Sequence, residues 1–270
     1  YFKELEGKHG IVLSGGQKAW YAGKWRTQRE AMRKEFPSTP EEAVNAHTRG
    51  AIYGEEISRA RAEGRVCGFN LEPGLPYYIA WDIGMSDFTD LWLVQPAGAQ
   101  HRVYRFYENS GHGVDHYAEV VKAWEREHGP SALNLLPHDA GRRVFGTAGG
   151  LTTVQVLEGM GVRNCVVVPR TPDVWVGING LRGMMANMVF HREYLTEERV
   201  KDGVRFPSAL GALESYRTHA DGSAAVIREM PVHDQASHAA DALRTYAEAW
   251  AAGMVSSFGG GARKRVRVVR

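Results

Sequence analysis

Three acidic residues stand at the ends of predicted secondary-structure elements or within a predicted helix. Asp82 ends the apolar stretch 77–81, which predicts a buried strand, and Gly84 behind it allows a sharp turn. Asp139 ends a second apolar stretch in the same manner, and Asp241 lies in a predicted C-terminal helix. Hydrolysis of a phosphodiester on two Mg²⁺ or Mn²⁺ ions needs hard oxygen ligands from several segments of the chain. We therefore predict that the three carboxylates converge on divalent metal.

Each acid in these segments also has a purely structural interpretation. Asp82 and Asp139 are both followed by glycine-containing turns, in which a carboxylate can bond to nearby backbone. Asp234 has the position of a helix cap, and Asp87 and Asp90 have the setting of loop residues. The residue types alone leave both interpretations open for Asp82, Asp139 and Asp234, and favour the loop for Asp87 and Asp90.

Histidines and arginines beside the acids are also ambiguous. His138 and His238 adjoin Asp139 and the predicted C-terminal helix, but a single histidine is more often a structural hydrogen-bonding group than a ligand or base. Arg142 and Arg143 could steer a phosphate or could be a solvated pair.

The composition is that of a soluble globular protein with room for one large domain and an arm. The chain has 270 residues and a formal net charge of +2, so the total charge does not demand a nucleic-acid partner. Cys67 and Cys165 lie far apart and signal neither a disulfide framework nor a zinc site. The sequence has no phosphate-cradling ATPase loop, no apolar run long enough to span a bilayer and no leader, which favours a cytosolic protein.

The order of predicted elements indicates an α/β fold. Strands at 77–82, 91–95 and 102–108, with turns around 86–90 and 96–100, predict an antiparallel meander. The next elements along the chain predict parallel strands with crossover helices and hence a mixed sheet, with Asp82 and Asp139 at carboxyl ends of strands, where open sheets bind ligands. These later elements are a helix at 114–128, a strand at 133–138, a helix at 152–160 and a strand at 164–168.

Other segments frame this predicted domain, residues 76–252. Residues 1–75 form an arm with a helix start near Thr39 and Pro40 and a helix at 55–63. Residues 173–232 form an insertion, and the C-terminal helix has one apolar face and one polar face. The tail, 253–270, is rich in glycine and then in arginine and lysine, and is either solvated or in contact with DNA. Within the insertion we predict helices at 176–189 and 208–217 and a strand at 224–227.

Five motifs, in this order and spacing, resemble the nuclease domain of the large terminase subunit of tailed bacteriophages. The resemblance spans about residues 20 to 250, and its most specific piece is the last. The motifs are Glu-Phe-Pro-Ser-Thr-Pro-Glu-Glu-Ala at 35–43, Asp-Ile-Gly at 82–84 with Asp87, Pro-His-Asp-Ala-Gly at 137–141, Ala-Leu-Glu-Ser-Tyr-Arg at 212–217 and His-Asp-Gln-Ala-Ser-His-Ala-Ala-Asp-Ala-Leu-Arg-Thr-Tyr at 233–246.

The resemblance implies an RNase H-like fold whose first and fourth strands lie side by side, with the last helix nearby. It implies that Asp82, Asp139 and Asp241 hold two Mg²⁺ or Mn²⁺ ions, with Asp87 or Asp234 as accessory ligands. The implied function is endonucleolytic cutting of concatemeric viral double-stranded DNA during genome packaging, in the host cytoplasm. The implied partners are the portal protein and the small terminase subunit, with no membrane.

An ATPase domain precedes this domain in such proteins, and a chain that starts at Tyr1 without methionine suggests a piece of a longer one. Two alternatives stay open. The chain could be another RNase H-like nuclease, of the resolvase or transposase type, or a docking module with little activity of its own.

Overall fold

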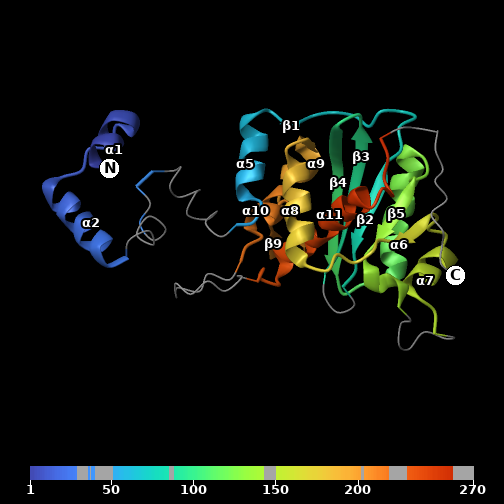
Figure 1. Ribbon diagram of the computed structural model, residues 1–270. Coiled ribbons are helices and arrows are strands. Elements are labelled where there is room, and N and C mark those ends of the chain that lie inside the picture. The colour runs from blue at the N-terminus through green and yellow to red at the C-terminus, as the bar shows by residue number, and fades with distance from the viewer. Residues whose placement is uncertain are drawn as a thin grey trace.

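A mixed β-sheet forms the centre of the computed structural model, which describes residues 1–28, 36, 38, 39, 51–84, 88–142, 150–201, 204–218 and 230–257. Within these residues the sheet has seven strands in the order β1-β7-β4-β3-β2-β5-β6 (Figure 1). The strands are β1 (Val66–Cys67), β2 (Tyr78–Asp82), β3 (Phe88–Ala97), β4 (Gln100–Ser110), β5 (Leu133–Leu136), β6 (Cys165–Val167) and β7 (Met188–His191).

The strand directions place several strand ends at one edge of the sheet. β3 is antiparallel to both of its neighbours, β2 and β4, whereas β5 is parallel to β2. β7 is parallel to β4, and β6 is parallel to β5. The carboxyl ends of β2, β4 and β5 therefore share an edge.

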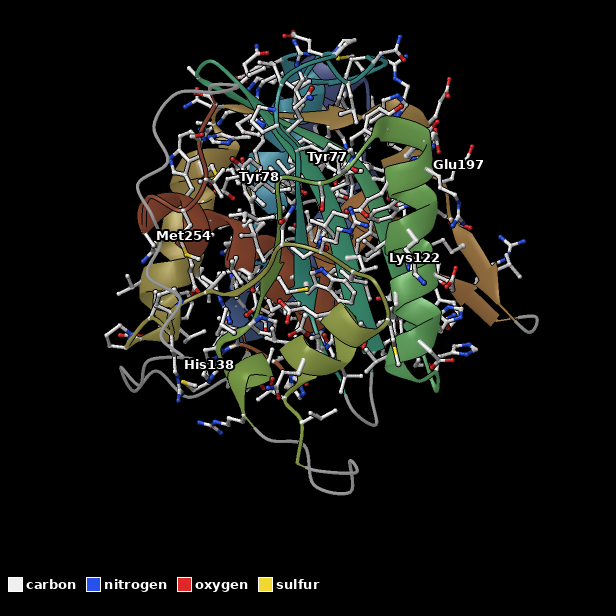
Figure 2. All side chains as sticks on the ribbon, turned by 90° about the vertical axis from the view of Figure 1, so that its right-hand side faces the viewer. Tyr77, Tyr78, Lys122, His138, Glu197 and Met254 are labelled. Carbon is white, nitrogen blue, oxygen red and sulfur yellow. The ribbon has the colours of Figure 1, made fainter. Side chains whose placement is uncertain are left out.

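Helices cover both faces of the sheet because alternate residues of the central strands are apolar on both sides. In β2, Tyr78 and Ala80 face one hydrophobic cluster while Ile79 and Trp81 face the other. Figure 2 shows Lys122, on α6, and Met254, just after α11, on opposite sides of the sheet. The first cluster includes residues of α5 (Gly54–Ala62), α8 (Val174–Met185), α10 (Ala209–Ser215) and α11 (Gln235–Ala251), and the second includes residues of α6 (Val114–His128) and α7 (Thr153–Gly159).

Shorter elements complete the described part of the chain. A 3₁₀ turn, η1 (His138–Gly141), comes after β5, and a helix, α9 (Arg192–Thr196), precedes the hairpin of β8 (Arg199–Lys201) and β9 (Val204–Phe206). No helix among the described residues is long and apolar enough to cross a membrane.

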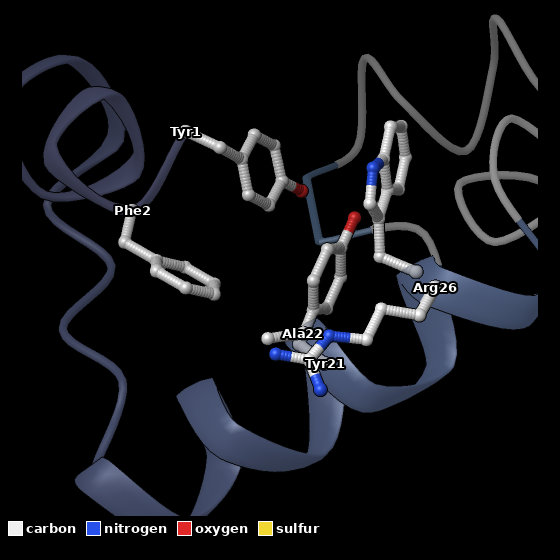
Figure 3. Close-up of a pocket in the computed structure, with 6 residues that line it drawn as sticks. Tyr1, Phe2, Tyr21, Ala22 and Arg26 are labelled. Atoms are coloured by element: carbon white, nitrogen blue, oxygen red, sulfur yellow. The ribbon is translucent and has the colours of Figure 1, made fainter.

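The first two helices pack on each other through aromatic rings. They are α1 (Phe2–His9) and α2 (Gly15–Gln28). Tyr21 stacks on Tyr1 at 5.0 Å between ring centroids and meets Phe2 edge-on. A pocket of about 320 Å³ lies between them (Figure 3). None of its lining residues is acidic, so it is no part of a carboxylate site.

The structure confirms the antiparallel meander, the crossover helices and the parallel pairing of the first and fourth strands. Two expectations are wrong. The predicted helix 176–189 ends at Met185, because Met188–His191 extends and pairs with β4 and β1. Asp90 belongs to β3 and not to a turn. The predicted strand 224–227 and the helix start at Pro40 lie outside the described residues.

Part of the expected arm packs in the core. Ile52, Tyr53, Ile57 and Val66 are buried in the first cluster with residues of α8 and α11, and β1 extends the sheet beside β7. Residues 51–67 therefore help to position the elements that carry the acids.

Candidate functional site

Three acidic residues form a row across the strands β2, β3 and β4, near the edge of the sheet where β2 and β4 end. In the strand register, Asp82 of β2 lies opposite Asp90 of β3, and Asp90 lies opposite Glu108 of β4. Residues directly opposite across strands share a face of the sheet. Asp90 shares the face of Trp92, which belongs to the cluster that α11 covers. We call Asp82, Asp90 and Glu108 the acid row.

Two side chains of the acid row, those of Asp90 and Glu108, are buried and partly without partners, whereas that of Asp82 is 22% exposed. Asp90 is 0% exposed, and neither of its carboxyl oxygens has a hydrogen-bond partner among the described residues. Glu108, whose side chain is 2% exposed, uses only Oε2, which lies 2.7 Å from Arg199 Nη1 and accepts from Gln235 Nε2 at 2.8 Å. Burial, followed by the charges of Glu108 and Asp82, raises the pKa of Asp90 well above its usual range.

The N-terminal half of α11 covers the acid row and adds two further groups. Trp92 Nε1 donates to the carbonyl of Ala239 at 2.8 Å, which fixes the helix against β3. His238 Nδ1 lies 2.9 Å from Asp82 Oδ2. Asp241 comes three residues later and so lies on the same side of the helix as His238. α11 thus places an imidazole and a fourth carboxylate beside the row.

Asp241 is held in an unfavourable environment for a charge. Burial raises its pKa to about 6; the guanidinium of Arg244 opposes this shift, and the charge of Asp82 adds to it. Arg244 Nη1 lies 2.8 Å from Asp241 Oδ1, an ion-pair distance, although Oδ1 makes no hydrogen bond among the described residues because the approach is poorly aligned. Arg244 is shared with Glu248, whose Oε1 lies 3.4 Å from its Nε.

A glycine of α8 makes room for this ion-paired group. A Cβ on Gly177 would meet Glu248 Oε1 at 2.4 Å and Arg244 Cδ at 2.7 Å. Contacts under 3.0 Å force the neighbouring atoms to move. The absence of a side chain at Gly177 therefore helps to keep Arg244 against Asp241.

We expect Gly177→Ala to destabilise the domain by about 1–3 kcal/mol, because overpacking displaces the Arg244 and Glu248 side chains. The free energy of unfolding in urea measures this. Gly180→Ala on the same helix is the matched control, since a Cβ there meets no atom within 4 Å. The control should be stabilising by up to about 1 kcal/mol through helix propensity. Equal effects at the two positions would contradict the packing argument.

The structure brings some of the predicted site residues together and leaves others apart. Asp82 and Asp241 lie near each other, with His238 on Asp82. Asp139 is exposed in η1, after the strand that pairs with β2, and so lies at the same edge of the sheet. Asp234 caps α11 by accepting from Ala236 N at 3.1 Å, and it pairs with Arg217 at 2.9 Å. Asp87 lies outside the described residues.

These acids are not gathered around one point in this structure. Among the described residues, no three histidine, cysteine or acidic side chains are close enough together to hold one metal ion. His138 and Arg142 are exposed near Asp139, and Arg143 lies outside the described part of the chain. The assignment of ligands stays a prediction.

Sequence reasoning missed Asp90 and Glu108 as members of the site. The signal that could have found them is the hairpin register, because Asp82 and Glu108 both pair with Asp90 once the strands are aligned. β3 is buried along most of its length, and most of its residues are apolar. The acid within it is recognisable as a site residue only when the pairing of β3 with β2 and β4 is known.

Comparisons with known proteins give a likeness of fold. No protein-family model and no curated protein sequence matches the chain. Among solved structures, the large terminase from the thermophilic bacteriophage D6E matches with a TM-score of 0.52 and 15% identity, covering 92% of this chain and 56% of that chain. Its complex with ATP-γ-S matches with a TM-score of 0.50 and 15% identity, over 71% of this chain and 44% of that chain.

An isolated domain matches as well. The nuclease domain of the P22 large terminase has a TM-score of 0.48 and 15% identity, and the match covers 68% of this chain and 86% of that chain. The chain spans about half the length of the D6E terminase. The described architecture is an RNase H-like mixed α/β fold, with a seven-stranded sheet between two layers of helices.

Proposed function

We propose that this chain is the nuclease part of a large terminase and cuts double-stranded DNA with divalent metal. The observation that carries the proposal is the cluster of Asp82, Asp90, Glu108 and Asp241 at the carboxyl edge of an RNase H-like sheet. Buried carboxylates that repel one another need a counter-charge, and a cation bound by oxygen ligands supplies it.

The residues present fit Mg²⁺ or Mn²⁺. Carboxylate oxygens are hard ligands of the kind these ions prefer. Three of the buried oxygens, both of Asp90 and Oε1 of Glu108, lack a hydrogen-bond partner among the described residues, so they are available to a cation. Oδ1 of Asp241 also lacks a hydrogen bond there, but it lies 2.8 Å from Arg244 Nη1. We propose Asp82, Asp139 and Asp241 as the ligands of two ions, with Asp87 or Asp234 as accessory ligands.

The protein's own groups would hold and orient this centre. Two divalent ions, when bound, would supply an activated water and neutralise charge on the phosphate that it attacks. Asp82 lies between β3 and β5, so it can face ligands from both sides. His238, through its contact with Asp82 Oδ2, fixes the orientation of that carboxylate. Arg244 restrains Asp241 in the same way.

The substrate and setting are proposed from the motif resemblance and from the fold shared with the D6E terminase. We propose concatemeric viral DNA in the host cytoplasm as the substrate, and the portal protein and the small terminase subunit as partners. An ATPase domain in the same full-length protein would drive packaging. Contacts should be mostly to backbone phosphates, so that affinity falls with salt.

The test is cutting of supercoiled plasmid by the purified chain with Mn²⁺, followed as nicked and linear DNA on a gel. Cutting that disappears with EDTA and with Asp139→Asn supports the proposal. If the wild-type chain does not cut, or if Asp139→Asn cuts at the wild-type rate, the proposed nuclease or its assigned ligands are wrong.

A further inference from the structure

We propose that Asp90 and Asp82, with Glu108 beside them in the acid row, bind a divalent cation on the β3 side of Asp82. This buried cation site is separate from the position that Asp139 would serve. A role of this ion in catalysis rests on the proposed function, whereas its binding does not.

The strand order separates the two positions. β3 lies on one side of β2 and β5 on the other, so Asp90 and Asp139 flank Asp82 from opposite sides. Asp90 is directly opposite Asp82, and side chains in such pairs have Cβ atoms about 4.5–5.5 Å apart. One ion with metal–oxygen distances of about 2.0–2.6 Å can be reached by carboxylates at that spacing.

Asp90 itself points to a missing partner. It is 0% exposed, and both of its oxygens lack a hydrogen-bond partner in the described part of the chain. A buried acid without a partner is unusual because burial removes its contact with water. Its neighbour Glu108 also leaves Oε1 unpartnered among the described residues.

The nearby guanidinium groups contact other acids and not Asp90. Arg199 contacts Glu108 Oε2 and donates to the carbonyl of Pro207 at 2.8 Å. Arg244 is shared between Asp241 and Glu248. Neither forms an ion pair with Asp90 in the described structure, so an external cation is the counter-charge that Asp90 still lacks.

The ligands favour a small hard cation. The row offers oxygen donors without sulfur, which suits Mg²⁺, Mn²⁺ or Ca²⁺. Mg²⁺ is commonly held by one or two carboxylates and completed by water, so the site does not need three side chains around one point. The competing explanation is that Asp90 is a neutral acid that binds no ion.

The experiment counts Mn²⁺ ions bound to the whole chain from the electron paramagnetic resonance signal of free Mn²⁺. Asp90→Asn should lose one bound ion or bind it at least about tenfold more weakly. Asp139→Asn should keep the Asp90-dependent ion, and Glu119→Gln, an exposed acid on α6, should bind as the wild type does. Circular dichroism checks that each variant is folded. Glu108→Gln provides a second test of the site if Asp90→Asn does not fold.

Each outcome decides the inference. Equal Mn²⁺ number and affinity in the wild type, Asp90→Asn and Glu108→Gln would overturn it. An Asp90→Asn variant with a higher melting temperature without metal and an unchanged Mn²⁺-induced shift would show a neutral buried acid, and would also overturn it. If the wild type cuts no plasmid but Asp90→Asn still loses one bound ion, the cation site is upheld and the proposed nuclease is rejected. The two failures are therefore distinguishable.

Discussion

Asp82→Asn is expected to lower Mn²⁺-dependent cutting of plasmid by at least about 100-fold while the domain stays folded. Asp82 is the carboxylate that lies between the two proposed cation positions, so its loss weakens both. An amide keeps the shape of the side chain and can still accept from His238, but it removes the negative charge that attracts metal. The initial rate of nicking, at saturating Mn²⁺, measures the effect.

Glu119→Gln is the matched control for this prediction. Its side chain is exposed on α6 and pairs with Lys122, on the face of the sheet opposite the acid row. It should cut at the wild-type rate. Near-normal cutting by a folded Asp82→Asn protein would remove Asp82 from the proposed machinery.

The second large effect is on stability against pH in the absence of metal. The pKa of Asp241 is about 6 in the fold and 3.8 in its ordinary range. Between these values the folded state keeps a proton that the unfolded state has released, so stability falls as pH rises from about 4 to about 6. A shift of this size corresponds to about 3 kcal/mol. Asp241→Asn should remove this loss.

The measurement is urea unfolding of wild type and Asp241→Asn in EDTA at several pH values. The quantity to compare is the difference in the free energy of unfolding between the two proteins. The pKa of Asp90 is also raised, so Asp90 lowers the stability of both proteins as the pH rises. The difference should grow between pH 4 and pH 6 and then level off. A constant difference across that range would mean that Asp241 ionises normally in the fold.

Much of the fold could be predicted from local sequence patterns. Helix 114–128 shows amphipathic spacing over its whole length, and the structure gives it the predicted bounds. β7 could not be predicted in this way. Met188–His191 extends only because it pairs with β4 and β1, which are distant in the sequence. A short apolar segment next to a helix has no periodicity of its own that distinguishes the two structures.

The candidate site was predictable only in part, for a similar reason. Asp82 stands out because it ends an apolar stretch, but Asp90 becomes a site residue only through its register with Asp82 and Glu108. That register also depends on an irregularity between Leu93 and Val94 in the pairing of β3 with β4. Like charges placed opposite one another disfavour a sheet, so local rules argue against the observed arrangement.

The separation in sequence between the acid row and its cover has a consequence for folding. β2, β3 and β4 are consecutive in the chain, so their pairing closes short loops, whereas His238 of α11 lies 156 residues beyond Asp82. Short-range pairing is fast, and closing a long loop costs more chain entropy. We therefore expect the repelling carboxylates to meet before the helix that encloses them has docked. Docking of α11 is then the step that completes both the hydrophobic core and the site, so the site matures only as the whole domain does.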